Sequence, residues 1–355
     1  MVLTSDCHKI QLKTVWRAVG KNMTLKVDHI SAFLDQQAPP TTKLDFDNIG
    51  LLLGSPSATV SSVLCVLDVT PEVIEEAKTQ KADLIVAHHP LIFKKLSRIN
   101  PSTEEGWMIS ELLKHDIAVF AAHTNYDLAN DGVSFIMADK LGLSETEFLD
   151  PLQDHDCLLE VTSNPAYARE IQNLLHQYGD SIAYSSSAAG EAHFKVTAQQ
   201  YMVRDLQKAL SEIDEQCRSW SYPVKQDEAA HGLGVVGFLD EPVKPYKFLQ
   251  QVKKTFNCEY VAYSGNPDTI ERVALCGGAG APLISKALAK ADAYITADLK
   301  YHDYFTGTPD FLLADIGHYE SEIPSVDELA DRLRRRFEDL NVQVTSVNTN
   351  PINHL

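Results

Sequence analysis

The stretch Asp83-Leu-Ile-Val-Ala-His-His-Pro90 decides the fold class. Its apolar run has the length of a strand and ends in two neighbouring histidines, which proline follows at once. Near-continuous apolar runs of this kind are typical of parallel strands that are covered on both faces. Imidazole nitrogens are common metal ligands. We therefore expect a buried parallel strand that presents metal ligands at its carboxyl end.

Strands and helices alternate on both sides of this stretch. The flanking patterns predict strands 63–69 and 117–122 and helices 71–80 and 105–115. The alternation resumes near residue 234, where the predicted elements are strand 234–239, a helix from Pro245, strand 273–276, a glycine-rich turn 277–280, helix 281–289, strands 293–296 and 310–316, and a helix 326–340 capped by Ser325 and Glu328. This order predicts an α/β fold.

The middle of the chain has a different pattern. Strands 157–162 and 192–197 and helices 166–178 and 203–213 indicate a small α+β module. A chain of 355 residues is expected to hold two domains. We therefore predict an N-terminal extension over 1–22, a discontinuous α/β domain over 23–149 and 232–355, and an inserted α+β domain over 150–231.

The composition argues against two classes of partner. A net charge of −18 disfavours nucleic acid, and the basic stretch at Arg334–Arg336 is interleaved with acids, as on a solvated helix face. The apolar runs are too short for a membrane span. The six cysteines contain no Cys-x-x-Cys pair, and several lie in apolar runs. We expect buried thiols and a cytoplasmic location.

Three predicted strand ends carry possible metal ligands. The first is His88-His89, the second leads from His123 to Asp127, and the third holds His318 and Glu322, four residues apart. A single histidine at a strand end is more often a hydrogen-bonded turn residue, but three equivalent clusters favour a shared site. If the strands are parallel, the clusters gather along one edge of the sheet, where open α/β folds bind ligands.

The donor set indicates divalent metal ions. Imidazole with carboxylate suits zinc, iron, manganese or nickel, and the lack of thiolates argues against a closed structural zinc site. Five or so candidate donors exceed the needs of one tetrahedral ion, so we expect two ions with Asp127 or Glu322 bridging them. Two neighbouring ions activate water for hydrolysis.

Other segments offer weaker candidates for the same pocket. Asp47 precedes a turn and a strand, and it can reach inward as a catalytic acid. The amides of Gly277, Gly278 and Gly280 can hold an anion if they open a helix. Asp298 and His302 follow another strand and are candidate catalytic residues. Each of these features has a plain structural alternative, such as a glycine turn or an exposed loop histidine.

Together these motifs resemble the GTP cyclohydrolase 1 type 2 homologue family, also described as NGG-one-interacting-factor-three-like proteins. The matching motifs are Asp47-Asn48-x-Gly50-Leu-Leu-x-Gly54, His88-His89-Pro90-Leu91, His123-Thr-Asn-x-Asp127, Gly277-Gly-x-Gly280, the segment from Thr296 to His302, and Gly317-His318-x-x-Ser321-Glu322. Each motif alone is unspecific, but the combination and its order are highly specific.

The resemblance implies a three-layer α/β/α sandwich domain interrupted by a PII/CutA-like inserted module. It also implies a ring-shaped homohexamer and a di-metal centre, whose ligands fall on His88, His89, Asp127, His318 and Glu322. One segment departs from the family pattern Thr-Gly-Glu-x-x-His-His, because it reads Thr296-Ala-Asp-Leu-Lys-Tyr-His302 here. This departure puts a catalytic role for the segment in doubt.

Two functions remain open at this stage. The first is a metal-dependent hydrolase that acts on a nucleotide or related small molecule, with a metal-bound hydroxide as the nucleophile. The second is a non-catalytic protein for metal storage or delivery, or a regulatory scaffold whose inserted module senses a small ligand. The ligand types do not identify the metal, because the same residues serve several ions.

Overall fold

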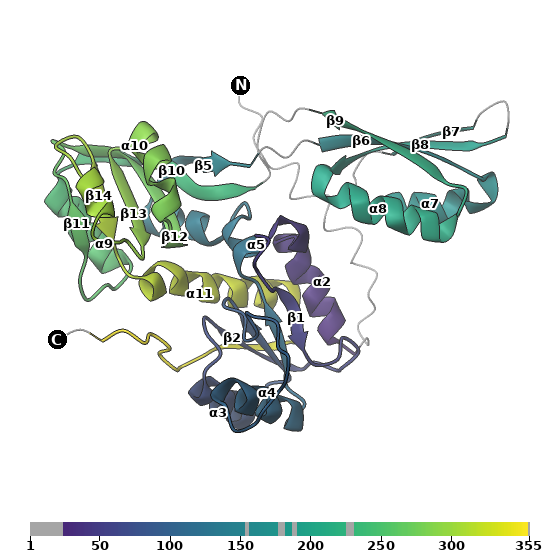
Figure 1. Ribbon diagram of the computed structural model, residues 1–355, viewed down its shortest axis with the longest axis horizontal. Coiled ribbons are helices and arrows are strands. Elements are labelled where there is room, and N and C mark those ends of the chain that lie inside the picture. Colours follow the sequence, from purple (N-terminus) through teal and green to yellow (C-terminus); the bar gives the residue numbers. More distant parts are fainter. Residues whose placement is uncertain (1–23, 153–155, 177–181, 187–189, 225–230, 354–355) are drawn as a thin grey trace.

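A computed structural model describes residues 24–152, 156–176, 182–186, 190–224 and 231–353. It confirms the mixed α/β class: the strands form three sheets, and helices pack against them (Figure 1). The extension expected over 1–22 lies outside the described residues. The helix expected next to it is α2 (Val27–Gln37), whose apolar side is buried.

The first sheet contains the strand that ends in His88 and His89. Its strands, in spatial order, are β1 (Gly50–Leu53), β4 (Ala118–Ala121), β3 (Leu84–Ala87), β2 (Ser62–Val66) and β15 (Asn341–Val344). All neighbours are parallel except the β1–β4 pair. The apolar side chains of α3 (Pro71–Gln80) and α4 (Glu104–Lys114) pack with one face of the sheet, which explains the continuous apolar runs.

The second sheet contains the strand that leads to His318. Its strands, in spatial order, are β11 (Ala262–Ser264), β14 (Leu312–Asp315), β13 (Ala293–Ala297), β12 (Ile270–Ala279), β10 (Gly232–Val243) and β5 (Ser144–Pro151). The three central strands β12, β13 and β14 are parallel. Helices α6 (Val133–Leu141) and α9 (Pro245–Thr255) share a core with one face, and α10 (Ile284–Lys290) with the other.

One long helix connects the two sheets. α11 (His318–Arg336) contacts β2 and β15 of the first sheet and β12 and β13 of the second, and it lies between them in Figure 1. Val326, Leu329 and Leu333 on this helix are buried in a core shared with the first sheet and α2. The two sheets therefore share a helical layer, and the first residue of that layer's longest helix is a candidate metal ligand.

The middle segment forms an antiparallel sheet of its own. Its strands, in spatial order, are β7 (Ile182–Ser186), β8 (Ala192–Gln199), β6 (Asp156–Ser163) and β9 (Arg218–Val224). Helices α7 (Ala168–Leu175) and α8 (Gln200–Ile213) share a separate apolar core with it. This agrees with the α+β pattern of the sequence, and the domain boundaries at 150 and 231 and the likeness to PII/CutA modules stay predictions.

Three local expectations were wrong. The parallel strands do not share one edge, because β3 and β4 belong to one sheet and β14 to another. Residues 277–279 are not a turn: they belong to β12, which pairs with β13 again at Ala279 after an irregularity in the register. The last helix begins at His318 rather than after Ser325, so Pro324 lies inside it and Ser325 is buried instead of capping.

Two further findings concern the chain as a whole. Within the described ranges, no helix is both long enough and apolar enough to cross a membrane. Among the described cysteines, Cys65, Cys157, Cys258 and Cys276 are buried. The expectation of buried thiols is therefore confirmed for these positions.

Candidate metal centre

The five predicted ligands come together between the two sheets. His88 and His89 follow β3, Asp127 ends the short helix α5 (Thr124–Asp127) after β4, and His318 and Glu322 lie on the first turns of α11. Glu322 Oε2 is the common point of the cluster. It lies 3.0 Å from His89 Nε2, 3.1 Å from His318 Nε2 and 3.7 Å from His88 Nε2.

Three buried atoms of this cluster lack a hydrogen-bond partner among the described residues. They are His88 Nε2, Asp127 Oδ1 and Glu322 Oε2. His88 is fully buried, and its Nδ1 lies 2.8 Å from the carbonyl oxygen of Ala122, which can only accept a hydrogen bond. The Nδ1 nitrogen therefore donates, which leaves the Nε2 lone pair facing two carboxylates. A buried polar atom without a partner is costly, so this arrangement fits a cation between the three atoms.

The remaining histidines are oriented in the same way by carboxylates. His89 Nδ1 donates to Asp68 at 2.7 Å, and His318 Nδ1 donates to Asp298 at 2.8 Å. Such outer hydrogen bonds fix the ring and the tautomer of metal-ligating histidines. The Nε2 atoms of both rings are thereby turned toward Glu322.

Two of the candidate catalytic acids, Asp298 and Asp47, also form hydrogen bonds to histidine rings of the cluster. Asp298 adopts a left-handed backbone with φ of +57°, which places its carboxylate against His318. Asp47 accepts hydrogen bonds from His123 Nδ1 at 2.9 Å and from the amide and hydroxyl of Thr124. Burial would raise the pKa of Asp47, but these hydrogen bonds from His123 and Thr124 outweigh it and hold that pKa well below its usual range. Both acids therefore accept hydrogen bonds from histidine rings and orient them.

The third candidate, His302, is not brought to the cluster. Its side chain is exposed next to η5 (Asp303–Thr306), and its recorded ring contacts are with Tyr301 and Phe305. Within the described part of the chain, no recorded interaction joins His302 to a predicted ligand.

The five predicted ligands omit His123, although the sequence placed it in the second cluster, and Asp68 was not predicted at the site. Donor atoms of His123, His88 and His89 lie within 4.8 Å of one another, so His123 is a sixth possible ligand. Asp68, the partner of His89, follows β2 directly. In the sequence, Asp68 could have been noticed as an acid that interrupts the apolar run 63–69, which is the strand before the one that ends in His88.

The glycines of the 277–280 segment allow α11 to approach β12. Gly278 has φ of +60°, and a Cβ atom there would lie 2.2 Å from Glu322 Oε1. Its amide donates to Ser321 Oγ, and the amide of Gly277 donates to Ser134 Oγ. These engaged amides argue against the expected anion role of Gly277 and Gly278, and Gly280 accepts a hydrogen bond from the Tyr294 hydroxyl through its carbonyl.

Without a metal, the cluster holds protons. Burial would lower the pKa of His89, but the carboxylates of Asp68 and Glu322 outweigh it and raise the pKa to about 10. The neighbouring Glu322 carboxylate raises the pKa of His318 to about 9. Burial would raise the pKa of Glu322, yet the neighbouring His88 and the other imidazoles hold it well below its usual range. The site therefore favours positive charge next to an ionised Glu322.

With this geometry in place, comparison with known proteins assigns the class. Residues 25–351 match the family model described as Duf34/NIF3 (NGG1p interacting factor 3). The chain belongs to this family. A relative named GTP cyclohydrolase 1 type 2 homolog, from Bacillus subtilis, is 32% identical over 92% of this chain and 98% of its own length.

Solved structures support the same assignment. A Bacillus cereus protein described as related to NIF3 is 27% identical, with a TM-score of 0.74 over 94% of this chain and 100% of that one. A Staphylococcus aureus protein is 26% identical, with a TM-score of 0.75 and the same coverage. Both therefore share the fold over nearly the whole length of this chain.

The outer carboxylates generate a first prediction. Replacing Asp68 or Asp298 by asparagine keeps the shape but removes the charge that fixes a histidine ring, and asparagine also tolerates the left-handed backbone at 298. We expect each variant to bind Zn²⁺ about 10-fold to 100-fold more weakly in competition with a chromophoric chelator. The control is Asp310→Asn, an exposed acid before β14. Affinities equal to that of the control would contradict the orienting role.

The raised pKa values of His89 and His318 generate a second prediction. Both rings carry a proton at Nε2 at neutral pH, and a metal ion must displace it. Apparent Zn²⁺ affinity should therefore rise with pH from 6 to about 10 and level off once both rings are deprotonated. Calorimetry in buffers of different ionisation enthalpy should show proton release at pH 7. An affinity that is constant between pH 6 and 8 would contradict this.

Proposed function

We propose that the chain is a metal-dependent hydrolase that acts on a nucleotide or related small molecule. The observation that carries the proposal is the convergence of His88 Nε2, Asp127 Oδ1 and Glu322 Oε2, all buried and without a hydrogen-bond partner among the described residues. Burying polar atoms without hydrogen-bond partners costs free energy, so such a cluster is expected where a charged ligand occupies it.

Two overlapping donor sets support two ions. One consists of His89, His318 and Glu322, and the other of His88, Asp127 and Glu322. Glu322 belongs to both, so it is the residue that would serve both ions. Zinc, iron, manganese and nickel all suit these donors. Two bound divalent ions supply an activated water and stabilise an oxyanion in hydrolysis.

The residues of the chain divide the remaining tasks. Asp68, Asp298 and the carbonyl of Ala122 hold the imidazoles in place. His123 is held by the ionised Asp47, is partly exposed, and has a donor atom within 4.8 Å of those of His88 and His89. We propose that His123 positions the substrate or completes the ligand set.

We propose the ring-shaped homohexamer that the family resemblance implies, with the metal centres facing an internal cavity. We also propose a cytoplasmic location, since the buried thiols suit a reducing compartment.

Turnover tests this function directly. Protein reconstituted with manganese, zinc or iron should hydrolyse at least one member of a nucleotide panel. His88→Ala and Glu322→Gln should lower kcat by at least about 100-fold, because each removes a buried ligand. Asp310→Asn is the matched control. Fully metallated protein that turns over no member of the panel would favour the non-catalytic function.

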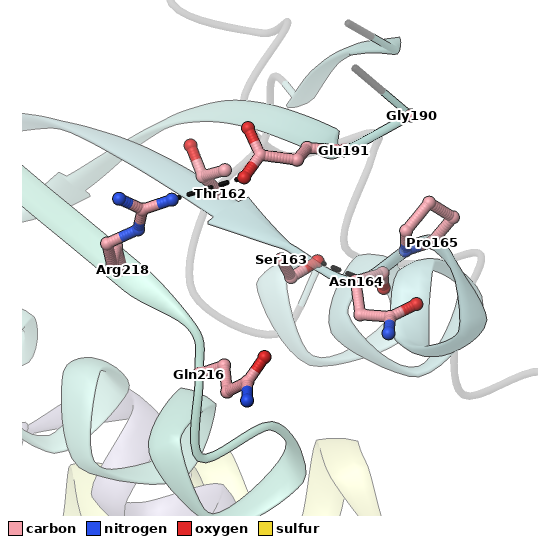
Figure 2. Close-up of a pocket in the computed structure, with 8 residues that line it drawn as sticks. All are labelled: Thr162, Ser163, Asn164, Pro165, Gly190, Glu191, Gln216 and Arg218. Carbon is pink, nitrogen blue, oxygen red and sulfur yellow. Dashed lines mark hydrogen bonds and ion pairs between the residues drawn. The ribbon is translucent and has the colours of Figure 1, made fainter.

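One observation favours that second candidate, a regulatory scaffold or metal-delivery protein. The middle sheet carries a polar cavity of about 540 Å³ lined by Thr162, Ser163, Asn164, Pro165, Gly190, Glu191, Gln216 and Arg218 (Figure 2). Its walls are tied together by the buried Asp214, which accepts hydrogen bonds from the amides of Asn164 and Gln216. Arg218 and Glu191 are paired across it at 3.1 Å.

A binding screen tests the second candidate. If the module senses a small ligand, equilibrium dialysis against carboxylates and nucleotides should find one whose binding is lost in Arg218→Gln. The metal content should be unchanged, because the cavity and the metal centre share no residues. Arg169→Gln, on α7 and outside the cavity lining, is the control.

A further inference from the structure

Two exposed phenylalanines extend from the metal centre to the surface. The ring of Phe93 lies 6.3 Å from the ring of His123, which in turn lies 5.3 Å from the rings of both His88 and His89. Phe46 packs edge-on against Phe93, with 6.2 Å between centroids. Phe46 is 63% exposed and Phe93 is 43% exposed. An aromatic row therefore leads out of the cluster and ends in solvent.

The backbone that carries this pair is held in place. Asn48 donates a hydrogen bond of 2.6 Å from its side chain to the carbonyl oxygen of Ile92, the residue before Phe93. Asp47, the residue after Phe46, is buried and bonded to His123 and Thr124. The two rings are thus presented by segments anchored to the metal centre, as expected for a preorganised binding surface.

Cations follow the same aromatic pair. Lys94 and Lys95 come directly after Phe93, so the Cα of Lys95 lies within about 7 Å of the Cα of Phe93. Arg98 follows in the same segment, and all three side chains are exposed. None of these three cations forms an ion pair with another described residue. Three exposed cations that follow Phe93, in a chain with net charge −18, mark a segment that attracts an anion.

We infer that Phe46 and Phe93 pack against the planar ring of the substrate and that Lys94, Lys95 and Arg98 bind its phosphate. This inference rests on the proposed hydrolase function and narrows its substrate class to a heteroaromatic phosphate, such as a nucleotide. Every heterocyclic base has a face that can stack on phenylalanine, so the pair selects for a ring without selecting one base. The cations select for the charged group at the other end.

A small ligand explains this patch better than a second copy of the chain. A stable protein interface buries about 800 Å² on each partner, far more than two phenylalanine side chains provide. The patch is also continuous with the histidine cluster through the contact of Phe93 with His123. That continuity is what a substrate needs in order to reach the metal centre.

The test separates ring recognition from phosphate recognition. Calorimetry on protein purified with its native metal content measures the affinity of guanosine monophosphate, guanosine and ribose 5-phosphate. Phe46→Ala/Phe93→Ala should weaken binding of the first two about 10-fold and leave ribose 5-phosphate unchanged. Lys94→Gln/Lys95→Gln should weaken both phosphates and leave guanosine unchanged. Tyr246→Ala and Lys247→Gln, on the exposed side of α9, are the matched controls.

The outcomes distinguish this inference from the proposed function. Ring-dependent binding without any turnover would retain the inference and overturn the hydrolase. If the protein hydrolyses nucleotides and the phenylalanine variant keeps the same relative affinities for the three ligands, the hydrolase function would be retained and the inference overturned. A phenylalanine variant that dissociates in sedimentation analysis, with unchanged affinity per subunit, would assign the patch to an interface instead and overturn the inference. Circular dichroism of each variant excludes unfolding as the cause.

Discussion

The burial of the Glu322 carboxylate among three imidazoles is the constraint on which the rest of this structure depends. An ionised group with almost no access to water must be compensated by nearby positive charge, or its burial would destabilise the fold. His88, His89 and His318 converge on it from two sheets. Their Nε2 atoms can offer that compensation either by carrying protons or by binding a cation.

Several features of the fold serve this single requirement. α11 places Glu322 one turn after His318 and inserts both between the sheets. Gly278 lets the helix come within reach of β12, where any side chain would collide with the carboxylate. Carboxylates in the outer layer then fix the rings. A cluster arranged in this way is rigid before any ligand arrives, as function at a metal site requires.

The carboxylates that bond to the histidine rings explain why residue types alone predict the wrong role at some positions. Asp47 and Asp298 look like free acids in the sequence, since both stand near glycines or strand ends. In space each accepts a hydrogen bond from a histidine, so each orients a ring instead of facing the substrate. His302 has the right chemistry for catalysis but points into a surface cluster of aromatic rings. Side-chain direction depends on contacts made across distant elements, which no local pattern encodes.

The sequence by itself determined the α/β class and the types of ligand at the strand ends, because apolar periodicity and strand-end donors are local properties. Its resemblance to the family implied the set His88, His89, Asp127, His318 and Glu322. Only the tertiary structure decided that these donors come from two sheets, that Glu322 is their common point and that His123 and Asp68 belong to the site. Sheet membership depends on pairing between strands far apart in the chain, and donor order depends on which side chains the packing buries. These are non-local quantities, so they appear only once the chain is folded.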